Sequence, residues 1–393
     1  MDLAYLSDWA SLLIRWLHLI AGIAWIGTSF YFIGLDNQLD PPRDGNPRVK
    51  GEQWSIHGGG FYHKQKYAVA PAQLPEKLHW FKWEAYWTWI SGFALFTLIY
   101  WGQASTYLID PAVLDMPPWL AVTISAVMLV AGWVIYDLVC KSKFGEDETK
   151  LTLFGIALLV VTAFVACHIF SGRGAFLQVG AMTGTIMVAN VAMVIIPGQR
   201  KMVAAMQAGR EPDPKYGRWG KQRSVHNTYL TLPVLFLMIS PHYPMTWSGP
   251  WNWVVLLAVT LAGALVRQFF VQRQFGRNPV LLPAAATVVV VGLMFLLQPK
   301  RGPDLAGVEV PPVERVQAIV ASHCATCHAA RPTFEGMAAA PKGVMLESPQ
   351  QIRRWAAAMR QQVATEAMPP GNVTEITPDE RAQLLAWIAA GAP

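Results

Sequence analysis

The chain has 393 residues, of which 53% are hydrophobic and only 14% are charged. Soluble domains carry about 25% charged residues, so this chain is not a soluble globule throughout. The net charge of +6 does not indicate nucleic-acid binding, because the basic residues stand in short runs between apolar segments and form no stripe with interleaved aromatics. We therefore expect a membrane protein, with the lipid bilayer and no nucleic acid among its partners.

Eight apolar runs of membrane-spanning length follow one another along the chain. They begin near residues 9, 82, 117, 151, 175, 226, 248 and 278, and each lasts roughly 17–25 residues, the length that crosses the hydrocarbon core. The sixth run is the weakest, because it is short and contains Pro233. Since only helices and closed barrels satisfy the backbone in lipid, residues 1–298 are predicted to form a polytopic membrane helix bundle of about eight transmembrane helices, in a chain that is all-α.

Basic residues are concentrated in alternate loops of this bundle. Loops 36–82, 141–150, 198–224 and 267–277 hold seven, three, seven and three Lys or Arg residues. The segments between them, at 1–10, 102–116, 172–175 and 241–250, hold only Arg173. Because cytoplasmic loops are enriched in Lys and Arg, we expect both ends of the chain to face away from the cytoplasm.

The composition changes after Leu297. Residues 299–312 are rich in proline and polar residues, which is typical of a linker, and a small soluble domain is expected over residues 313–393. Its first helix is predicted at 313–322. Two further helix starts are indicated by Ser348-Pro349-Gln350-Gln351 and Thr377-Pro378-Asp379-Glu380, where an N-cap residue precedes a proline and a Gln or Glu stands at the third helical position.

The most specific motif is Cys324-Ala325-Thr326-Cys327-His328, the C-x-x-C-H sequence at which haem c is attached. The two thiols can add to the two vinyl groups of one porphyrin, and His328 can bind the iron. A zinc site would need further ligands, for which the rest of the domain offers only His323. A thioredoxin-like dithiol would need a βαβ pattern, which the sequence lacks. We therefore predict one covalent haem c, held by Cys324, Cys327 and His328.

The sixth ligand of this iron is expected later in the same domain, where the candidates are Met337, Met345, Met359 and Met368. Met368 precedes Pro369-Pro370-Gly371, a rigid non-helical stretch that can hold a thioether over a haem face, as in small class I cytochromes c. Met359 lies inside a predicted helix and is expected to pack. His328 and Met368 are thus the predicted iron ligands, a pair that raises the reduction potential.

Three histidines lie near the outer ends of predicted spans. His18 is about two turns into the first span, His168 is about one turn from the end of the fourth, and His242 ends the sixth. Ionisable groups inside a span are functional candidates, so His18 and His168 are a possible axial pair for a b-type haem, with Arg15 and Arg173 near its propionates. The alternatives are interfacial packing or helix–helix hydrogen bonds for the histidines, and snorkelling for the arginines.

A second polar group is expected on the cytoplasmic side, in residues 54–67 (WSIHGGGFYHKQKY). Its three glycines allow a ligand to approach the backbone closely, and His226-Asn227 opens the sixth span on the same side. The combination suits a planar, anionic substrate. The alternative is a basic loop with an amphipathic interfacial segment. The donors and flat rings of the segment are His57, His63, Lys64 and Lys66, and Phe61, Tyr62 and Tyr67.

The whole chain resembles the membrane-bound urate oxidases (urate hydroxylases) of bacteria, in which a multi-helix domain precedes a cytochrome c. The resemblance is carried by LIRWLHLIAGIAWIGTSFYFI, WSIHGGGFYHKQKY, HWFKWEAYWTWISG and SVHNTYLTLPVLF, and by CATCH with MPPGN near the end. The haem motif is shared with many cytochromes, whereas the N-terminal segments are much more particular.

This resemblance implies that urate loses two electrons and gains water to give 5-hydroxyisourate, with the electrons passing through haem c to a downstream cytochrome c or terminal oxidase of the respiratory chain. It implies a bacterial inner-membrane protein, with the N-terminus and the cytochrome domain in the periplasm. The expected donors and general base at the urate site are His57, His63, Lys64, His226 and Asn227. Electrons must then cross about 30 Å of hydrocarbon, which favours a haem b in the membrane domain.

Two other functions remain open from the residues themselves. The first is another membrane oxidase or dehydrogenase, which takes electrons from a quinol or a haem precursor. The second is a membrane-anchored electron carrier. One helix suffices for an anchor, so eight helices and a polar HGGGFYHKQKY segment argue against the carrier.

Overall fold

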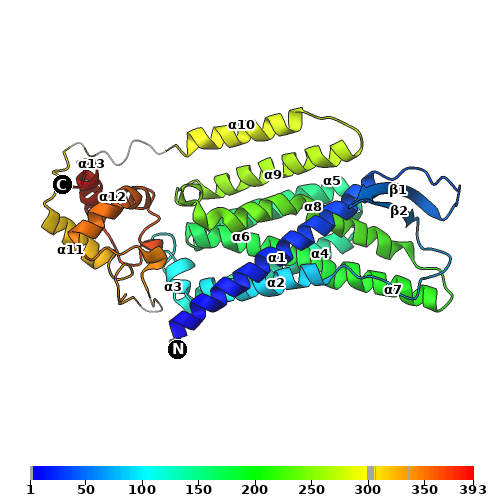
Figure 1. The fold of residues 1–393 in the computed structure, drawn as a ribbon, viewed down its shortest axis with the longest axis horizontal. Helices are drawn as coiled ribbons and strands as arrows, with labels where there is room; N and C mark the ends of the chain where they lie inside the picture. Colours follow the sequence, from blue (N-terminus) through cyan, green and yellow to red (C-terminus); the bar gives the residue numbers. More distant parts are fainter. Residues whose placement is uncertain (1–2, 299–304, 306, 335–336, 338) are drawn as a thin grey trace.

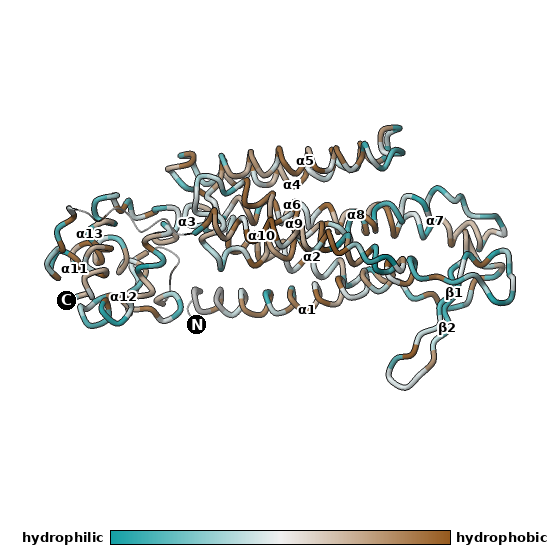
Figure 2. Tube along the Cα trace, turned by 90° about the horizontal axis from the view of Figure 1, so that it is seen from above, coloured by the Kyte–Doolittle hydropathy of each residue, from teal (hydrophilic) through white to brown (hydrophobic). Residues whose placement is uncertain are grey.

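The computed structural model describes residues 3–298, 305, 307–334, 337 and 339–393, and it is mostly helical. Figure 1 shows an elongated bundle of helices with a β-hairpin at one end and a small helical domain at the other. We call these the hairpin end and the small-domain end. Figure 2 shows that apolar residues dominate the middle of the bundle and polar residues the hairpin.

Helices occupy all eight of the predicted apolar runs. Among the described residues, five helical segments are long and apolar enough to cross a membrane, which is the pattern of a multi-pass membrane protein: Trp9–Asn37, Pro118–Lys141, Glu148–Ile169, Gly172–Gln207 and Asn252–Gln274. The helices of the bundle are α1 (Leu3–Asn37), α2 (Trp83–Phe96), α3 (Ala104–Tyr107), α4 (Pro118–Lys141), α5 (Glu148–Ile169), α6 (Gly172–Ala189), α7 (Ile196–Gln207), α8 (Pro214–Ile239), α9 (Asn252–Gln274) and α10 (Leu281–Leu296).

Two π-helical segments interrupt the regular helices. One, Thr97–Trp101, extends α2, and the other, Asn190–Ile195, joins α6 to α7 into one continuous helix. The helix formed by α6 and α7 therefore runs well into the predicted loop 198–224. Most of the remainder of that loop belongs to α8, whose first turn is set by Asp213 as N-cap and by Pro214 at the first position.

The all-α prediction is wrong for residues 49–67. Strands β1 (Val49–His57) and β2 (Gly60–Tyr67) form an antiparallel hairpin in which His57 pairs with Gly60. Gly58 and Gly59 have φ values of 57° and 81°, the positive values that a two-residue type I′ turn requires. The glycines therefore serve the turn, and the expectation that they admit a ligand to the backbone stays a prediction.

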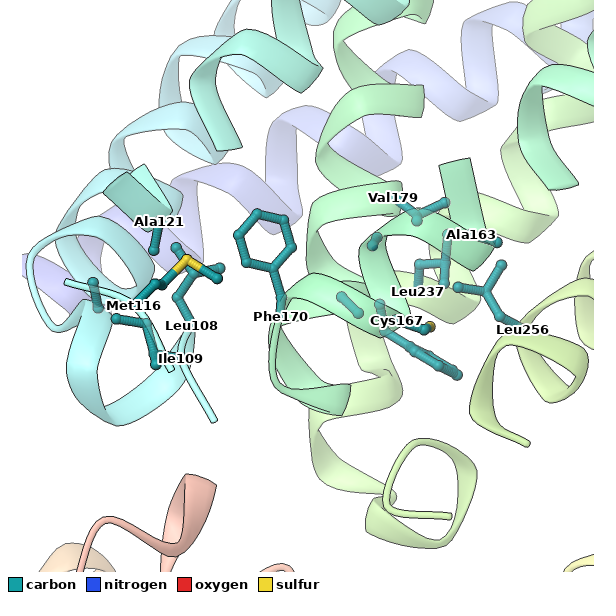
Figure 3. Packing of buried hydrophobic residues seen from close by; sticks show 14 residues of the cluster. Leu108, Ile109, Met116, Ala121, Ala163, Cys167, Phe170, Val179, Leu237 and Leu256 are labelled. Carbon is teal, nitrogen blue, oxygen red and sulfur yellow. The ribbon is translucent and has the colours of Figure 1, made fainter. Parts of the chain in front are cut away.

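The best-packed part of the bundle lies at the small-domain end. Phe170 and Phe176 are fully buried, together with Leu237 of α8 and Leu256 of α9, and Figure 3 shows this core beside Leu108, Ile109 and Met116 of the segment after α2. Between helices in a bilayer, such close packing stabilises through van der Waals contacts rather than through removal of apolar surface from water. This core therefore fixes α5, α6, α8 and α9 relative to the surface that faces the small domain.

The small domain contains α11 (Val313–His323), α12 (Pro349–Ala364) and α13 (Pro378–Ala389) around a core that includes Trp387. All three predicted helices are confirmed. Ser348 and Thr377 form capping boxes with Gln351 and Glu380, as their spacing predicts. Half of the expected linker at 299–312, namely 299–304 and 306, lies outside the described residues.

Candidate functional site

The C-x-x-C-H motif forms a single turn that continues α11. The backbone N–H groups of Cys327 and His328 both donate to the carbonyl oxygen of Cys324, at 3.1 and 2.8 Å. The Nδ1 atom of His328 lies 2.9 Å from the carbonyl oxygen of Val344, to which it donates, and this leaves Nε2 free to bind a metal. Two thiols and one imidazole nitrogen on one turn fit the covalent attachment of haem c.

The same turn is unsuited to zinc or to dithiol chemistry. Burial raises the pKa of the Cys324 thiol to about 12 and also raises the pKa of Cys327, so neither thiol is activated as the nucleophile of a redox dithiol. Both ring nitrogens of His323 are engaged, Nδ1 2.6 Å from the Thr374 carbonyl oxygen and Nε2 3.4 Å from a Glu380 carboxylate oxygen. Within the described residues, no group of three or more His, Cys, Asp or Glu is placed to hold a metal ion.

The candidate methionines differ in their surroundings. Met359 is buried in the domain core, where the sequence predicted packing. Met368 is half-buried in the segment 368–372, which we call the distal loop, and its carbonyl oxygen accepts a hydrogen bond of 2.8 Å from Arg381. Met368 as an iron ligand stays a prediction.

The distal loop rests against the bundle. A Cβ atom at Gly371 would come within 2.7 Å of the Ile109 carbonyl oxygen, so the two backbones are in direct contact. Lys342 of the small domain is also close enough to His242, just after α8, to interact with it electrostatically. The small domain thus presents its distal loop to α3 and the residues that follow it (Figure 1).

A cavity of about 280 Å³ lies inside the bundle between α1, α2, α6 and α8. Its wall extends from Arg15 to Ile26 on α1, and from Thr231 on α8 to His242 in the short turn that follows α8. At 1.5 Å per residue each of these stretches is about 16 Å long. Most of the wall is apolar, and its basic side chains are Arg15, His18, Arg173 and His242. We call this space the membrane cavity.

His18 is held in a fixed orientation at this cavity. Its Nδ1 atom lies 3.0 Å from the carbonyl oxygen of Thr88 and 3.2 Å from the hydroxyl of Ser91. A Cβ atom at Gly92 would come within 2.8 Å of the His18 ring, so glycine at this position makes room for the imidazole. With Nδ1–H donating to the Thr88 carbonyl, Nε2 is left as the unprotonated nitrogen.

The structure does not bring His168 to His18. His168 is exposed, its Nδ1 atom lies 2.7 Å from the Phe164 carbonyl oxygen, and its ring centroid is 4.1 Å from that of Phe164. His168 does not line the membrane cavity, whereas His242 does. The prediction that His18 and His168 form an axial pair is therefore wrong. The His168 ring packs against Phe164, one turn earlier on α5, and not against the membrane cavity.

A cluster of buried polar side chains lies towards the hairpin end. The Tyr136 hydroxyl and Nδ1 of His226 lie 2.6 Å apart and share a hydrogen bond, and the same hydroxyl accepts one of 3.3 Å from Asn190. Asn190 also donates to Asn227, at 2.9 Å. Arg223 is 1% exposed, and two of its guanidinium nitrogens, Nε and Nη1, have no hydrogen-bond partner. We call these five residues the polar cluster.

The polar cluster adjoins the membrane cavity. Asn227 donates to the carbonyl oxygen of Met187, and Thr231 donates to the carbonyl oxygen of Asn227. Met187 and Thr231 both line the cavity. The cluster therefore meets one end of the cavity, and His242 lies at the other.

The hairpin residues form a separate group. Nε2 of His63 is 2.9 Å from a Glu52 carboxylate oxygen, and Nζ of Lys64 donates to the Ser55 hydroxyl at 2.8 Å. His57 is exposed beside the turn. In the part of the chain that the structure describes, no hydrogen bond, ion pair or ring contact joins these side chains to His226 or Asn227.

Sequence reasoning missed Tyr136, Asn190 and Arg223. Tyr136 and Asn190 lie in apolar helices without a motif, and Arg223 was counted only as a loop charge. The sole sequence signal is that polar residues in a span are expensive and therefore functional candidates. Asn190 opens a π-helical segment and Tyr100 of the cavity wall belongs to the other, in keeping with the frequency of π-bulges at functional sites.

The comparisons with known proteins assign both parts of the chain. A family model described as urate oxidase N-terminal matches residues 4–298. A second, described as cytochrome c oxidase, cbb3-type, subunit III, matches residues 311–388 and agrees with the haem c turn. Neither the curated proteins nor the solved structures give a match. The chain therefore belongs to the urate oxidase N-terminal family and continues into a cbb3-type cytochrome c domain that implies a covalent haem c.

Proposed function

We propose that this chain oxidises urate to 5-hydroxyisourate and passes the electrons to its own cytochrome c domain. The observation that carries the proposal is that a urate oxidase domain and a cytochrome c domain share one chain, with the distal loop of the second seated on the first. Urate and one water give 5-hydroxyisourate, two electrons and two protons. Bound haem c supplies a one-electron acceptor, so two transfers complete each turnover.

The polar cluster is the proposed urate site. Urate is an anion, and the buried guanidinium of Arg223, which donates to Asp137 through Nη2 at 2.9 Å, keeps two nitrogens, Nε and Nη1, without partners. Nδ1 of His226 shares a hydrogen bond with the Tyr136 hydroxyl. With Nδ1–H as the donor, Nε2 is left to accept the proton that urate loses, as general-base catalysis requires. Asn190 and Asn227 hold the helices of the cluster together through their hydrogen bond.

The hairpin is proposed to guide urate towards this site. Asp36 at the end of α1 pairs with Lys66 of β2 and lies 3.9 Å from Lys221 of α8, so the hairpin and the start of α8 share one end of the bundle. His57, His63 and Lys64 add positive or hydrogen-bonding groups there, and a local excess of positive charge raises the encounter rate with an anion.

The proposed topology follows from the charge bias of the loops. Eight helices cross the inner membrane, the hairpin end faces the cytoplasm, and the N-terminus and the cytochrome domain face the periplasm. Five of the helices have the length and composition of spans. The electrons then leave through the cytochrome domain to a soluble cytochrome c or a terminal oxidase.

A substrate comparison tests the proposal. The full-length chain in membranes is given urate, a quinol or a porphyrinogen, and reduction of haem c is followed by absorption. Urate is expected to reduce it and to yield 5-hydroxyisourate. The His226→Gln variant is expected to lose about 10²- to 10⁴-fold in rate, the range for loss of a general base, with the haem c content unchanged. His79→Gln, in a loop residue outside the polar cluster, is the matched control. Reduction by the quinol but not by urate would overturn the proposal.

A further inference from the structure

The membrane cavity has features that the urate site does not explain. It is mainly apolar and about 16 Å long, and it carries histidines on two different helical segments. His18 stands on α1, and His242 follows α8. Arg15 and Arg173 are close enough to His242 to interact with it electrostatically. We propose that the membrane cavity binds a second, non-covalent haem of the b type, with His18 and His242 as its iron ligands.

The orientation of His18 supports metal ligation. Metal-binding histidines usually donate their other ring N–H to a carbonyl or carboxylate oxygen, which fixes the tautomer. The 3.0 Å contact from Nδ1 of His18 to the Thr88 carbonyl has this form. The absence of a side chain at Gly92 leaves the space that the ring occupies. Nε2 is therefore the atom that remains for iron.

The donor set indicates a macrocycle. Besides His18 and His242, no His, Cys, Asp or Glu among the described residues lines the membrane cavity, so a metal held by these two histidines needs its other ligands from a cofactor. A porphyrin supplies four nitrogens, and its flat apolar ring matches a wall that includes Trp25, Trp89 and Phe93. Haem carries two propionates, and the guanidinium groups of Arg15 and Arg173 on the cavity wall can pair with them.

The position of the cavity suits a haem that transfers electrons from urate to haem c. This role rests on the proposed function. One end of the cavity meets the polar cluster through Met187 and Thr231. At the other end Arg173 donates to the Tyr100 hydroxyl at 3.2 Å and lies over the ring of Tyr107 in α3, the helix that the distal loop approaches. The iron alternates between Fe³⁺ and Fe²⁺, taking one electron from the urate side and giving it to haem c, so each urate requires two such transfers.

Haem analysis of the purified full-length chain tests the inference. Acidified acetone extracts haem b and leaves haem c on the protein, and each fraction is quantified as its pyridine complex. We expect one extractable and one covalent haem per chain. His18→Ala and His242→Ala are each expected to lose the extractable haem and to keep the covalent one, whereas His168→Ala is expected to keep both. A wild-type chain with a full complement of haem c and no extractable haem would overturn the inference.

A pair of glycine variants distinguishes a specific effect on His18 from general misfolding. Gly92→Ala pushes on the His18 ring, whereas Gly155→Ala on α5 meets open space. Only the first should lower the extractable haem. If both variants lose it equally, the assignment to His18 fails.

Activity separates this inference from the proposed function. A chain that lacks extractable haem and still reduces haem c with urate refutes the haem b site and leaves the function standing. If His18→Ala then raises the KM for urate, the membrane cavity is the urate pocket. A chain that contains haem b and is not reduced by urate keeps the haem site and refutes the function.

Discussion

At the residue scale, Met368 is the predicted ligand on the distal side of haem c. The Met368→Ala variant removes the thioether, and because Met/His ligation raises the reduction potential, the potential of haem c should fall. Redox titration of the full-length chain measures this change. Met345→Ala, in an exposed residue of the same domain, should leave the potential unchanged. An unaltered potential and spectrum in Met368→Ala would show that another residue binds the iron.

Residues differ in how far their roles can be inferred from the sequence. The ligands Cys324, Cys327 and His328 form one turn, so their chemistry is local and can be predicted from spacing alone. The partner of His18 depends on which helices surround the cavity, and no spacing contains that information. Nothing in the sequence favours His242 over His168 as the second histidine of the membrane cavity. The packing of the bundle places His242, and not His168, on the cavity wall.

At the scale of elements, helices whose ends carry their own signals were predicted well. The starts of α12 and α13 follow from Ser348 and Thr377, because a capping box involves only neighbouring residues. The hairpin was missed because its Gly58-Gly59 turn was interpreted as a ligand-binding loop, although glycine pairs also satisfy a type I′ turn. The π-helical segments have no sequence signature that we recognised, and both lie beside the candidate sites.

The hairpin should be sensitive to acid through Glu52. Glu52 is 3% exposed, and the hydrogen bond from His63 lowers the pKa of its carboxyl below the ordinary 4.5. A lowered pKa stabilises the folded hairpin above pH 4.5, and this stabilisation is lost as the pH falls through the lowered value. Protection of residues 49–67 from an acid-active protease should therefore decrease below about pH 4.5.

The matched variants for this prediction are Glu52→Gln and Glu76→Gln. The first cannot titrate, so the acid-dependent part of the protection should disappear. The second alters a carboxylate outside the hairpin and should behave as the wild type. An identical acid response in all three chains would show that Glu52 does not control the hairpin.

At the scale of the whole molecule, the two ends of the bundle are proposed to have different tasks. The proposal has urate enter at the hairpin end and electrons leave at the small-domain end, which lie at opposite ends of the bundle (Figure 1). The membrane character and the haem domain could be predicted from apolar runs and one motif, because each is encoded in a continuous stretch. The seating of the distal loop on Ile109 could not, because it depends on how two separately encoded domains meet.

The contact at Gly371 should control electron transfer between the domains. Gly371→Ala places a Cβ atom 2.7 Å from the Ile109 carbonyl oxygen and forces the domains apart. Gly343→Ala is the matched control, because Gly343 also has a positive φ, of 68°, but a Cβ atom there meets open space. Stopped-flow reduction of haem c by urate should be slowed in Gly371→Ala and not in Gly343→Ala. Equal rates in the two variants would show that the contact is not on the electron path.

The fate of the electrons from urate is the most direct test of the account. Purified full-length chain is mixed with limiting urate without oxygen, and reduced haem c and 5-hydroxyisourate are quantified together, with an added soluble cytochrome c as the final acceptor. The account predicts two electrons delivered through haem c for each urate consumed, and no hydrogen peroxide when oxygen is then admitted. Urate consumption that requires oxygen, yields peroxide and leaves haem c oxidised would contradict it.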